Sequence, residues 1–200
     1  MLTLVSLTDG DRDVRKLSIP LLSVLFLLAG CERLTEAPFG VEWNGGPEYL
    51  KSLNLPTFNE IPLKDGVVIL YVTTPPSESL NTEGAYNFYY NNKKLNKIIF
   101  NSYDFTGSDS VEKSKVAYEK IKNILSERYG RPVKIKEKVY NENFAFFPCI
   151  TNKNCGSWES EYDYKTFFIR VYIGMGERGW SYAEKRLSGR VYVEFTPKIN

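Results

Sequence analysis

Hydrophobic positions follow helical spacing in one long segment of the chain, residues 111–129. The apolar stripe of this segment contains Ala117, Tyr118, Ile121, Ile124, Leu125 and Tyr129. Asp109 and Glu112 have the spacing of an N-cap and a capping box, and Gly130 provides a stop signal. The pattern therefore predicts one long helix with a buried face.

Most other apolar positions alternate with polar ones, which is typical of strands with one wet face. Residues 67–73 form a β-branched and aromatic run. Two runs flank Asn91–Lys94, which predicts a hairpin with Tyr86, Phe88 and Tyr90 on one face. Later runs cover residues 133–140, 166–173 and 189–195. The order of elements predicts an α+β fold: a mainly antiparallel sheet with one long helix packed on one face.

Three shorter elements are also predicted. Phe39, Val41 and Trp43 alternate in a short strand. Residues 47–55 form a short helix that begins at Pro47, and residues 180–187 form another between the last two strands. These elements add to the same domain rather than suggesting a second one.

The first 30 residues have the pattern of a secretory signal. Arg12, Arg15 and Lys16 precede an almost purely apolar run at residues 17–28. As a helix this run measures roughly 18 Å, which is short of the ~30 Å hydrocarbon core of a membrane. We therefore expect an export signal rather than a permanent transmembrane helix.

The apolar run ends in the sequence Leu28-Ala29-Gly30-Cys31. This sequence resembles the lipobox of bacterial lipoproteins. The resemblance implies that diacylglycerol is attached to the Cys31 thiol, that the signal is cut before Cys31, and that the new amino terminus is acylated. The alternatives are a secretory signal with a coincidental cysteine and a buried apolar segment.

The resemblance also implies a domain organisation and a location. Residues 1–30 are a signal peptide that is removed, residues 31–46 are the lipidated cysteine and its tether, and residues 47–200 are a single globular domain. The protein is expected in the cell envelope, held by its lipid on the outer or the inner membrane, with the domain in the periplasm. Glu32 leaves the choice of membrane open.

The two remaining cysteines agree with export. Cys149 and Cys155 are an even pair, and in an oxidising compartment such a pair is expected to form a disulfide. The bridge would close a hairpin or a tight loop and contribute about 2.4 kcal/mol in the chain-entropy model. The alternative is a redox or metal-binding pair.

Composition excludes several functions. The 200 residues carry a net charge of +2, which lacks the basic excess of a nucleic-acid-binding protein. The chain has no histidine, so Ser-His-Asp catalysis, His-ligated zinc and histidine pH switches are excluded. We expect no cofactor and no metal.

Two sets of residues are candidates for an interaction surface. Lys134, Lys136 and Lys138 would project in a row from one strand face, opposite Val133, Ile135, Glu137 and Val139. Such a row can bind phosphates or anionic lipid headgroups, or it can protect an edge strand from pairing with another chain. Tyr86 and Tyr90 suit protein interfaces or sugar stacking, although tyrosine also favours strands for packing alone.

Three acidic residues are the main catalytic candidates. Glu159, Glu161 and Asp163 alternate after Trp158 and would project from one face of a strand. Paired carboxylates beside aromatic residues are typical of glycoside hydrolases, but they also occur on solvated strand surfaces.

These observations favour a membrane-anchored envelope lipoprotein with a non-catalytic binding role. Its partner would be an envelope protein, so that it acts as an assembly factor, a scaffold, or an inhibitor or immunity protein. The alternatives are an envelope glycan hydrolase using Glu159 and Glu161, and a carrier of a small apolar ligand.

Overall fold

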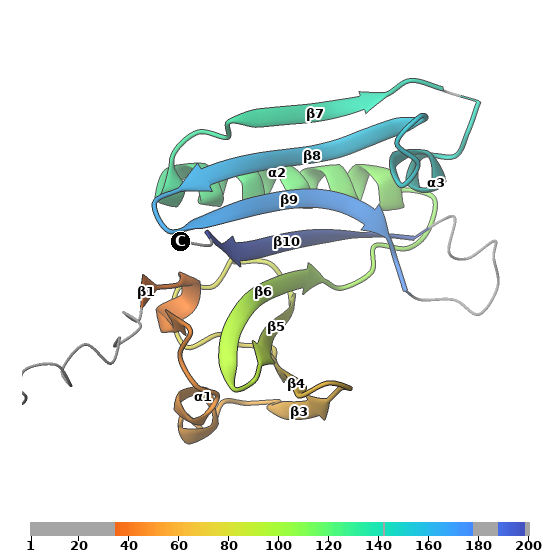
Figure 1. Cartoon of the computed structure of the whole chain (residues 1–200). Coiled ribbons are helices and arrows are strands. Elements are labelled where there is room, and N and C mark those ends of the chain that lie inside the picture. Colours follow the sequence, from red (N-terminus) through yellow and green to blue (C-terminus); the bar gives the residue numbers. More distant parts are fainter. Residues whose placement is uncertain (1–34, 142, 178–187, 199–200) are drawn as a thin grey trace, which may run out of the picture. The chain divides into compact units, whose positions relative to one another are not determined.

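The computed structural model describes residues 35–141, 143–177 and 188–198. In this part of the chain, eight antiparallel strands form one sheet (Figure 1). The strands are β3 (Asn59–Pro62), β4 (Val67–Val72), β5 (Gly84–Asn91), β6 (Lys94–Ser102), β7 (Lys134–Val139), β8 (Gly156–Tyr164), β9 (Phe167–Met175) and β10 (Gly189–Pro197). Their spatial order is β3-β4-β5-β6-β10-β9-β8-β7. The signal region with Cys31, and the helix predicted at 180–187, lie outside the described residues.

One long helix, α2 (Ser110–Tyr129), packs against strands β8 to β10 (Figure 1). The predicted α+β class is therefore confirmed. Tyr118, Ile121 and Leu125 have no exposed surface, because the predicted apolar stripe faces the sheet. The sheet face that contacts α2 is called the inner face below, and the opposite face is the outer face.

The predicted signals at the ends of α2 have different outcomes. Gly130 follows the last turn with a φ of 90°, as a helix stop requires. The predicted cap of Asp109 is wrong, because its side chain makes no capping hydrogen bond. Its carboxylate lies 2.9 Å from Lys113 Nζ instead, and that contact lowers the pKa of Asp109.

The segment between residues 35 and 52 contributes to the core. It contains β1 (Thr35–Glu36), the 3-10 helix η1 (Pro38–Gly40), β2 (Glu42–Trp43) and α1 (Glu48–Ser52). Phe39, Val41 and Trp43 are buried as their alternation predicts, but the predicted strand is confirmed only at β2, because Phe39 lies in η1 with a φ of 66°. The Phe39 ring packs 5.0 Å from Tyr86 and 5.2 Å from Phe195. Residues that the sequence assigned to the end of the tether are thus part of the folded unit.

The hairpin between β5 and β6 is confirmed. Asn91 pairs with Lys94, and Asn92 and Lys93 form the turn with positive φ angles of 49° and 63°. Tyr86, Phe88 and Tyr90 all point to the buried face of β5. The hairpin therefore supplies a continuous aromatic row to the core.

Strand β7 forms one end of the sheet and pairs with β8. The sequence placed Val133 and Ile135 on the strand face opposite the lysines, and both side chains are exposed. Val133 is 67% exposed and Ile135 is 54% exposed, because α2 packs mainly against β8 to β10 and leaves most of this edge uncovered.

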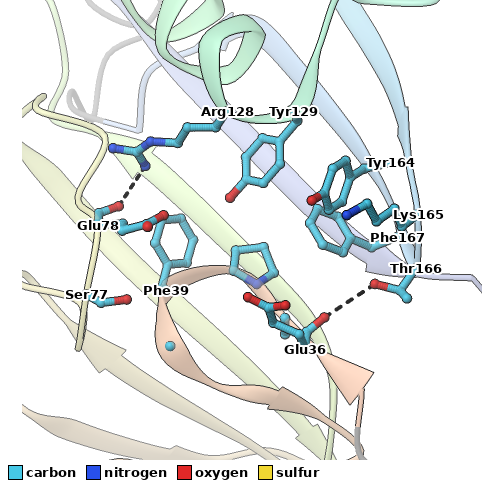
Figure 2. A pocket seen from close by; sticks show the side chains of 13 residues that line it. Glu36, Phe39, Ser77, Glu78, Arg128, Tyr129, Tyr164, Lys165, Thr166 and Phe167 are labelled. Carbon is cyan, nitrogen blue, oxygen red and sulfur yellow. Dashed lines mark hydrogen bonds between the residues drawn. The ribbon is translucent and has the colours of Figure 1, made fainter.

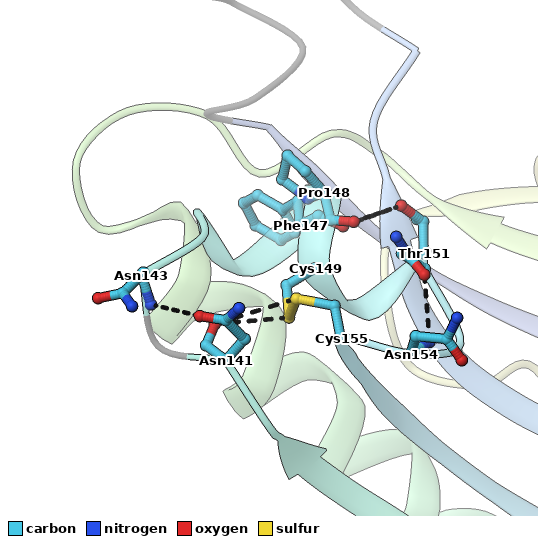
Figure 3. Close-up of a disulfide and its surroundings, with 9 residues drawn as sticks. Asn141, Asn143, Phe147, Pro148, Cys149, Thr151, Asn154 and Cys155 are labelled. Carbon is cyan, nitrogen blue, oxygen red and sulfur yellow. Dashed lines mark hydrogen bonds between the residues drawn. A yellow bond between two sulfur atoms is a disulfide. The ribbon is translucent and has the colours of Figure 1, made fainter.

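The predicted disulfide between Cys149 and Cys155 is present (Figure 3). Cys149 lies in the short helix α3 (Phe146–Ile150), and Cys155 directly precedes β8. The bridge therefore closes a tight loop at the end of α3, which is one of the two predicted alternatives. In this loop, Thr151 Oγ1 donates a 2.9 Å hydrogen bond to the Pro148 carbonyl. The disulfide fixes α3 where it contacts β7, β8 and β9.

Candidate functional site

A pocket of about 470 Å³ lies where the first described residues pass the end of α2 and the β8–β9 turn (Figure 2). We call it the N-terminal pocket. It is lined by residues 36–40, Ser77, Glu78, Arg128, Tyr129 and residues 164–167. Thr166 Oγ1 donates a 3.3 Å hydrogen bond to the Glu36 carbonyl, which fastens the first strand to the β8–β9 turn. The pocket is thus built by segments that lie far apart in the sequence.

Aromatic rings form one wall of the N-terminal pocket. The Tyr129 ring lies 5.0 Å from Tyr164 and 5.6 Å from Phe167, both in edge-to-face arrangements. The Tyr129 hydroxyl points into the pocket (Figure 2). Burial raises the pKa of Tyr129 to about 12, so this hydroxyl keeps its proton at neutral pH and can donate a hydrogen bond.

Charges of both signs surround this aromatic wall. Arg128 donates hydrogen bonds of 2.9 Å to the carbonyls of Glu78 and Ser79, which holds the loop at the rim. Lys165 Nζ lies 5.4 Å from the centroid of the Tyr164 ring. In the described part of the chain, the carboxylates of Glu36 and Glu78 form no ion pair. The pocket therefore offers two carboxylates and two cations that do not neutralise each other by direct contact.

The predicted lysine row and acidic row face each other on the outer face of the sheet. Lys134 pairs in register with Glu161 and forms a 2.5 Å ion pair with it. Lys136 pairs in register with Glu159, at an N–O distance of 3.6 Å. The two rows therefore pair with each other at two positions.

The remaining members of these rows also have partners. Asp163 forms an ion pair with Lys198. Lys138 Nζ lies 5.5 Å from the centroid of the Tyr140 ring. All three lysines lie on β7, which is the end strand of the sheet. This position agrees with the interpretation that the lysines protect an edge strand from pairing with another chain.

Glu159 is a poor candidate for a general acid. Arg170 donates two hydrogen bonds to Glu159 Oε2, of 2.8 Å from Nε and 2.5 Å from Nη2. Burial of Glu159 raises its pKa, but the hydrogen bonds and the charge of Arg170 outweigh burial and hold the pKa below its usual range. The carboxylate therefore stays ionised at neutral pH, whereas a glycosidase acid must be protonated there.

Tyr86 and Tyr90 do not form an interaction surface. Tyr86 is 1% exposed and Tyr90 is 2% exposed, because both side chains face the core. The Tyr86 hydroxyl accepts a 2.8 Å hydrogen bond from the Leu80 amide, so its polar atom serves the loop before β5. The prediction of these two residues as contact residues is corrected to a packing role.

The packing between α2 and the sheet does not favour the carrier alternative. Tyr118, Ile121 and Leu125 fill that interface with no exposed surface. Two further features are absent from the described residues, 35–141, 143–177 and 188–198. This part of the chain contains no group of three or more acidic or cysteine side chains able to hold a metal ion. It also contains no helix long and apolar enough to span a membrane.

No family model, no curated protein and no solved structure matches this chain. The candidate site must therefore be interpreted from its own residues. Sequence patterns did not point to Glu36, Arg128, Tyr129 or Lys165, since each is an ordinary residue in its own segment. Only the spatial approach of those segments makes them a site.

Proposed function

We propose that this chain is a cell-envelope lipoprotein, anchored through Cys31, whose domain works by binding rather than by catalysis. The observation that carries the proposal is a pocket built directly after a lipobox-like sequence. Glu36, which lines the pocket, is separated from Cys31 by only four residues. An anchored chain of this kind would keep the pocket at the membrane surface.

Two further observations support the proposal. The Cys149–Cys155 disulfide suits the oxidising conditions outside the cytoplasm. The acidic residues that would serve a hydrolase are occupied by ion pairs, with Glu159 held by Arg170 and Glu161 by Lys134. Binding is therefore favoured over glycan hydrolysis, and replacing Glu159 and Glu161 with glutamine is expected to leave cellular function intact.

The anchor is tested by labelling cells that produce the full-length chain with an alkyne fatty acid. The wild-type chain should carry the label and remain in the membrane fraction, because several acyl chains hold a protein firmly at about 0.8 kcal/mol per buried CH₂. The Cys31→Ser variant should lose the label. A Cys149→Ser/Cys155→Ser variant is the matched control and should keep it. Equal labelling of wild type and Cys31→Ser would refute the anchor.

A further inference from the structure

The aromatic wall of the N-terminal pocket is suited to a positively charged group. Ammonium groups are attracted to the faces of aromatic rings, and the attraction increases where carboxylates lie close by. Tyr129, Tyr164 and Phe167 supply the rings, while Glu36 and Glu78 supply carboxylates without an ion-pair partner in the described residues. Lys165 Nζ, 5.4 Å from the Tyr164 ring centroid, illustrates that these rings accept a cation.

The same pocket also has donors for an anion. Arg128 uses one N–H from each terminal nitrogen to bind the carbonyls of Glu78 and Ser79. A guanidinium has five N–H donors, so others remain for a ligand. Lys165 adds a second cation, and the Tyr129 hydroxyl adds a neutral donor. Phosphate oxygens are suitable acceptors for this set.

The mixed charges of the pocket favour a zwitterionic ligand. Two cations and two carboxylates line the pocket, so its formal charge is zero and a purely anionic ligand gains no net attraction. A molecule that carries a phosphate and an ammonium group close together can pair with both kinds of charge at once. The free headgroup, phosphoethanolamine, and the corresponding phospholipid share this chemistry.

The short segment between Cys31 and the pocket favours the phospholipid over the free headgroup as the ligand. Five residue steps join Cys31 to Glu36, and at ~3.3–3.6 Å each they span at most roughly 18 Å. A lipidated Cys31 would therefore hold the pocket within this distance of the membrane, where phospholipid headgroups are the most concentrated phosphates available.

We propose that the N-terminal pocket binds the phosphate-and-ammonium headgroup of a zwitterionic phospholipid in the membrane that holds the anchor. This inference rests on the proposed lipoprotein function. It assigns the recognition of the ammonium group to Glu36, Glu78 and the aromatic wall, and the recognition of the phosphate to Arg128 and Lys165.

Native mass spectrometry of the full-length protein, purified in detergent, tests the proposal. Three probes are titrated: short-chain phosphatidylethanolamine, phosphatidylglycerol with the same acyl chains, and free phosphoethanolamine. We expect phosphatidylethanolamine to bind at least fivefold tighter than phosphatidylglycerol. The Glu36→Gln/Glu78→Gln variant should lose at least fivefold in affinity for phosphatidylethanolamine only. Lys165→Gln should weaken both lipids.

Matched controls separate the site from general surface charge. The Glu42→Gln/Glu127→Gln variant removes two exposed carboxylates outside the pocket and should bind like the wild type. Equal affinity for both lipids, or equal losses in the pocket and control variants, would overturn the headgroup site. Free phosphoethanolamine binding as tightly as the lipid would overturn the lipid as the source.

The same spectra distinguish this inference from the anchor proposal. The mass of the protein itself reports acylation of Cys31. An unacylated chain that still prefers the zwitterionic lipid would contradict the anchor and support the pocket assignment. An acylated chain without this preference would support the anchor and overturn the pocket assignment.

Discussion

The hydroxyl of Tyr118 donates a 2.9 Å hydrogen bond to Glu137 Oε1, and this contact joins helix α2 to the edge strand β7. Lys122 Nζ lies 2.7 Å from the same oxygen, and Ser160 Oγ lies 2.7 Å from the Tyr118 hydroxyl. Because α2 leaves Val133 and Ile135 exposed, β7 is attached by this polar cluster, by its pairing with β8 and by its contact with α3.

Removal of the Glu137 carboxylate is expected to destabilise the protein. Glu137→Ala should lower the free energy of unfolding by about 1–3 kcal/mol, because Tyr118 and Lys122 each lose a hydrogen-bond partner. Urea unfolding measures the change. Glu127→Ala, which truncates an exposed side chain of α2, should stay within ~0.5 kcal/mol of the wild type. Equal effects of both variants would contradict this role of Glu137.

The stability of the protein is expected to fall in acid partly through Glu159. Its pKa in the folded chain lies below the ordinary value of 4.5, so the unfolded chain takes up the proton first as the pH falls. The contribution of Glu159 is thus complete above pH 4.5 and is lost as the pH falls through the folded pKa.

The pH dependence is measured by comparing wild type with Glu159→Gln. The difference in the free energy of unfolding between them should be largest at pH 6–7 and should shrink below pH 4.5. Glu127→Gln provides the control and should show no such trend. A difference that stays constant from pH 7 to pH 3 would show that Glu159 contributes by packing alone.

The disulfide is expected to contribute measurably to stability. Cys149→Ser/Cys155→Ser should lower the free energy of unfolding by about 2.4 kcal/mol, the chain-entropy value for a closed loop of this length. Thermal unfolding of wild type with and without reductant gives an independent measurement. If the reduced wild type unfolds at the same temperature as the oxidised one, the bridge has no stabilising role.

Gly189 is required by close packing rather than by backbone conformation. A β-carbon at this position would lie 1.9 Å from Phe147 Cε1 and 2.7 Å from Ser114 Oγ. Gly189→Ala should therefore cost about 1–3 kcal/mol or more, because Phe147 is buried and cannot move freely. In the double variant Gly189→Ala/Phe147→Leu the two costs should be less than additive, which a double-mutant cycle measures. Strict additivity would rule out the clash.

Local signals account for the parts of the fold that the sequence predicted correctly. Helical spacing with a terminal glycine marked α2, an Asn-Lys turn marked the β5–β6 hairpin, and the spacing of Cys149 and Cys155 marked the disulfide. Each signal lies within about twenty residues. The chain therefore specifies these elements by its short-range chemistry.

Long-range pairing accounts for what the sequence did not predict. The lysine row and the acidic row were interpreted separately, because the register that places Lys134 opposite Glu161 depends on how β7 meets β8. Glu36 and Arg128 line one pocket although 92 positions separate them by their numbers in the sequence. No periodicity within a segment contains such information.

The place of β10 in the sheet has a consequence for how the protein matures. β10 comes last in the described chain, yet it lies between β6 and β9 and joins the two halves of the sheet. During synthesis, the strands on either side emerge first and keep open edges until β10 is made. Folding therefore finishes only after β10 has emerged. A chain stalled before Gly189 would consist of two unjoined half-sheets, with exposed edges that favour aggregation.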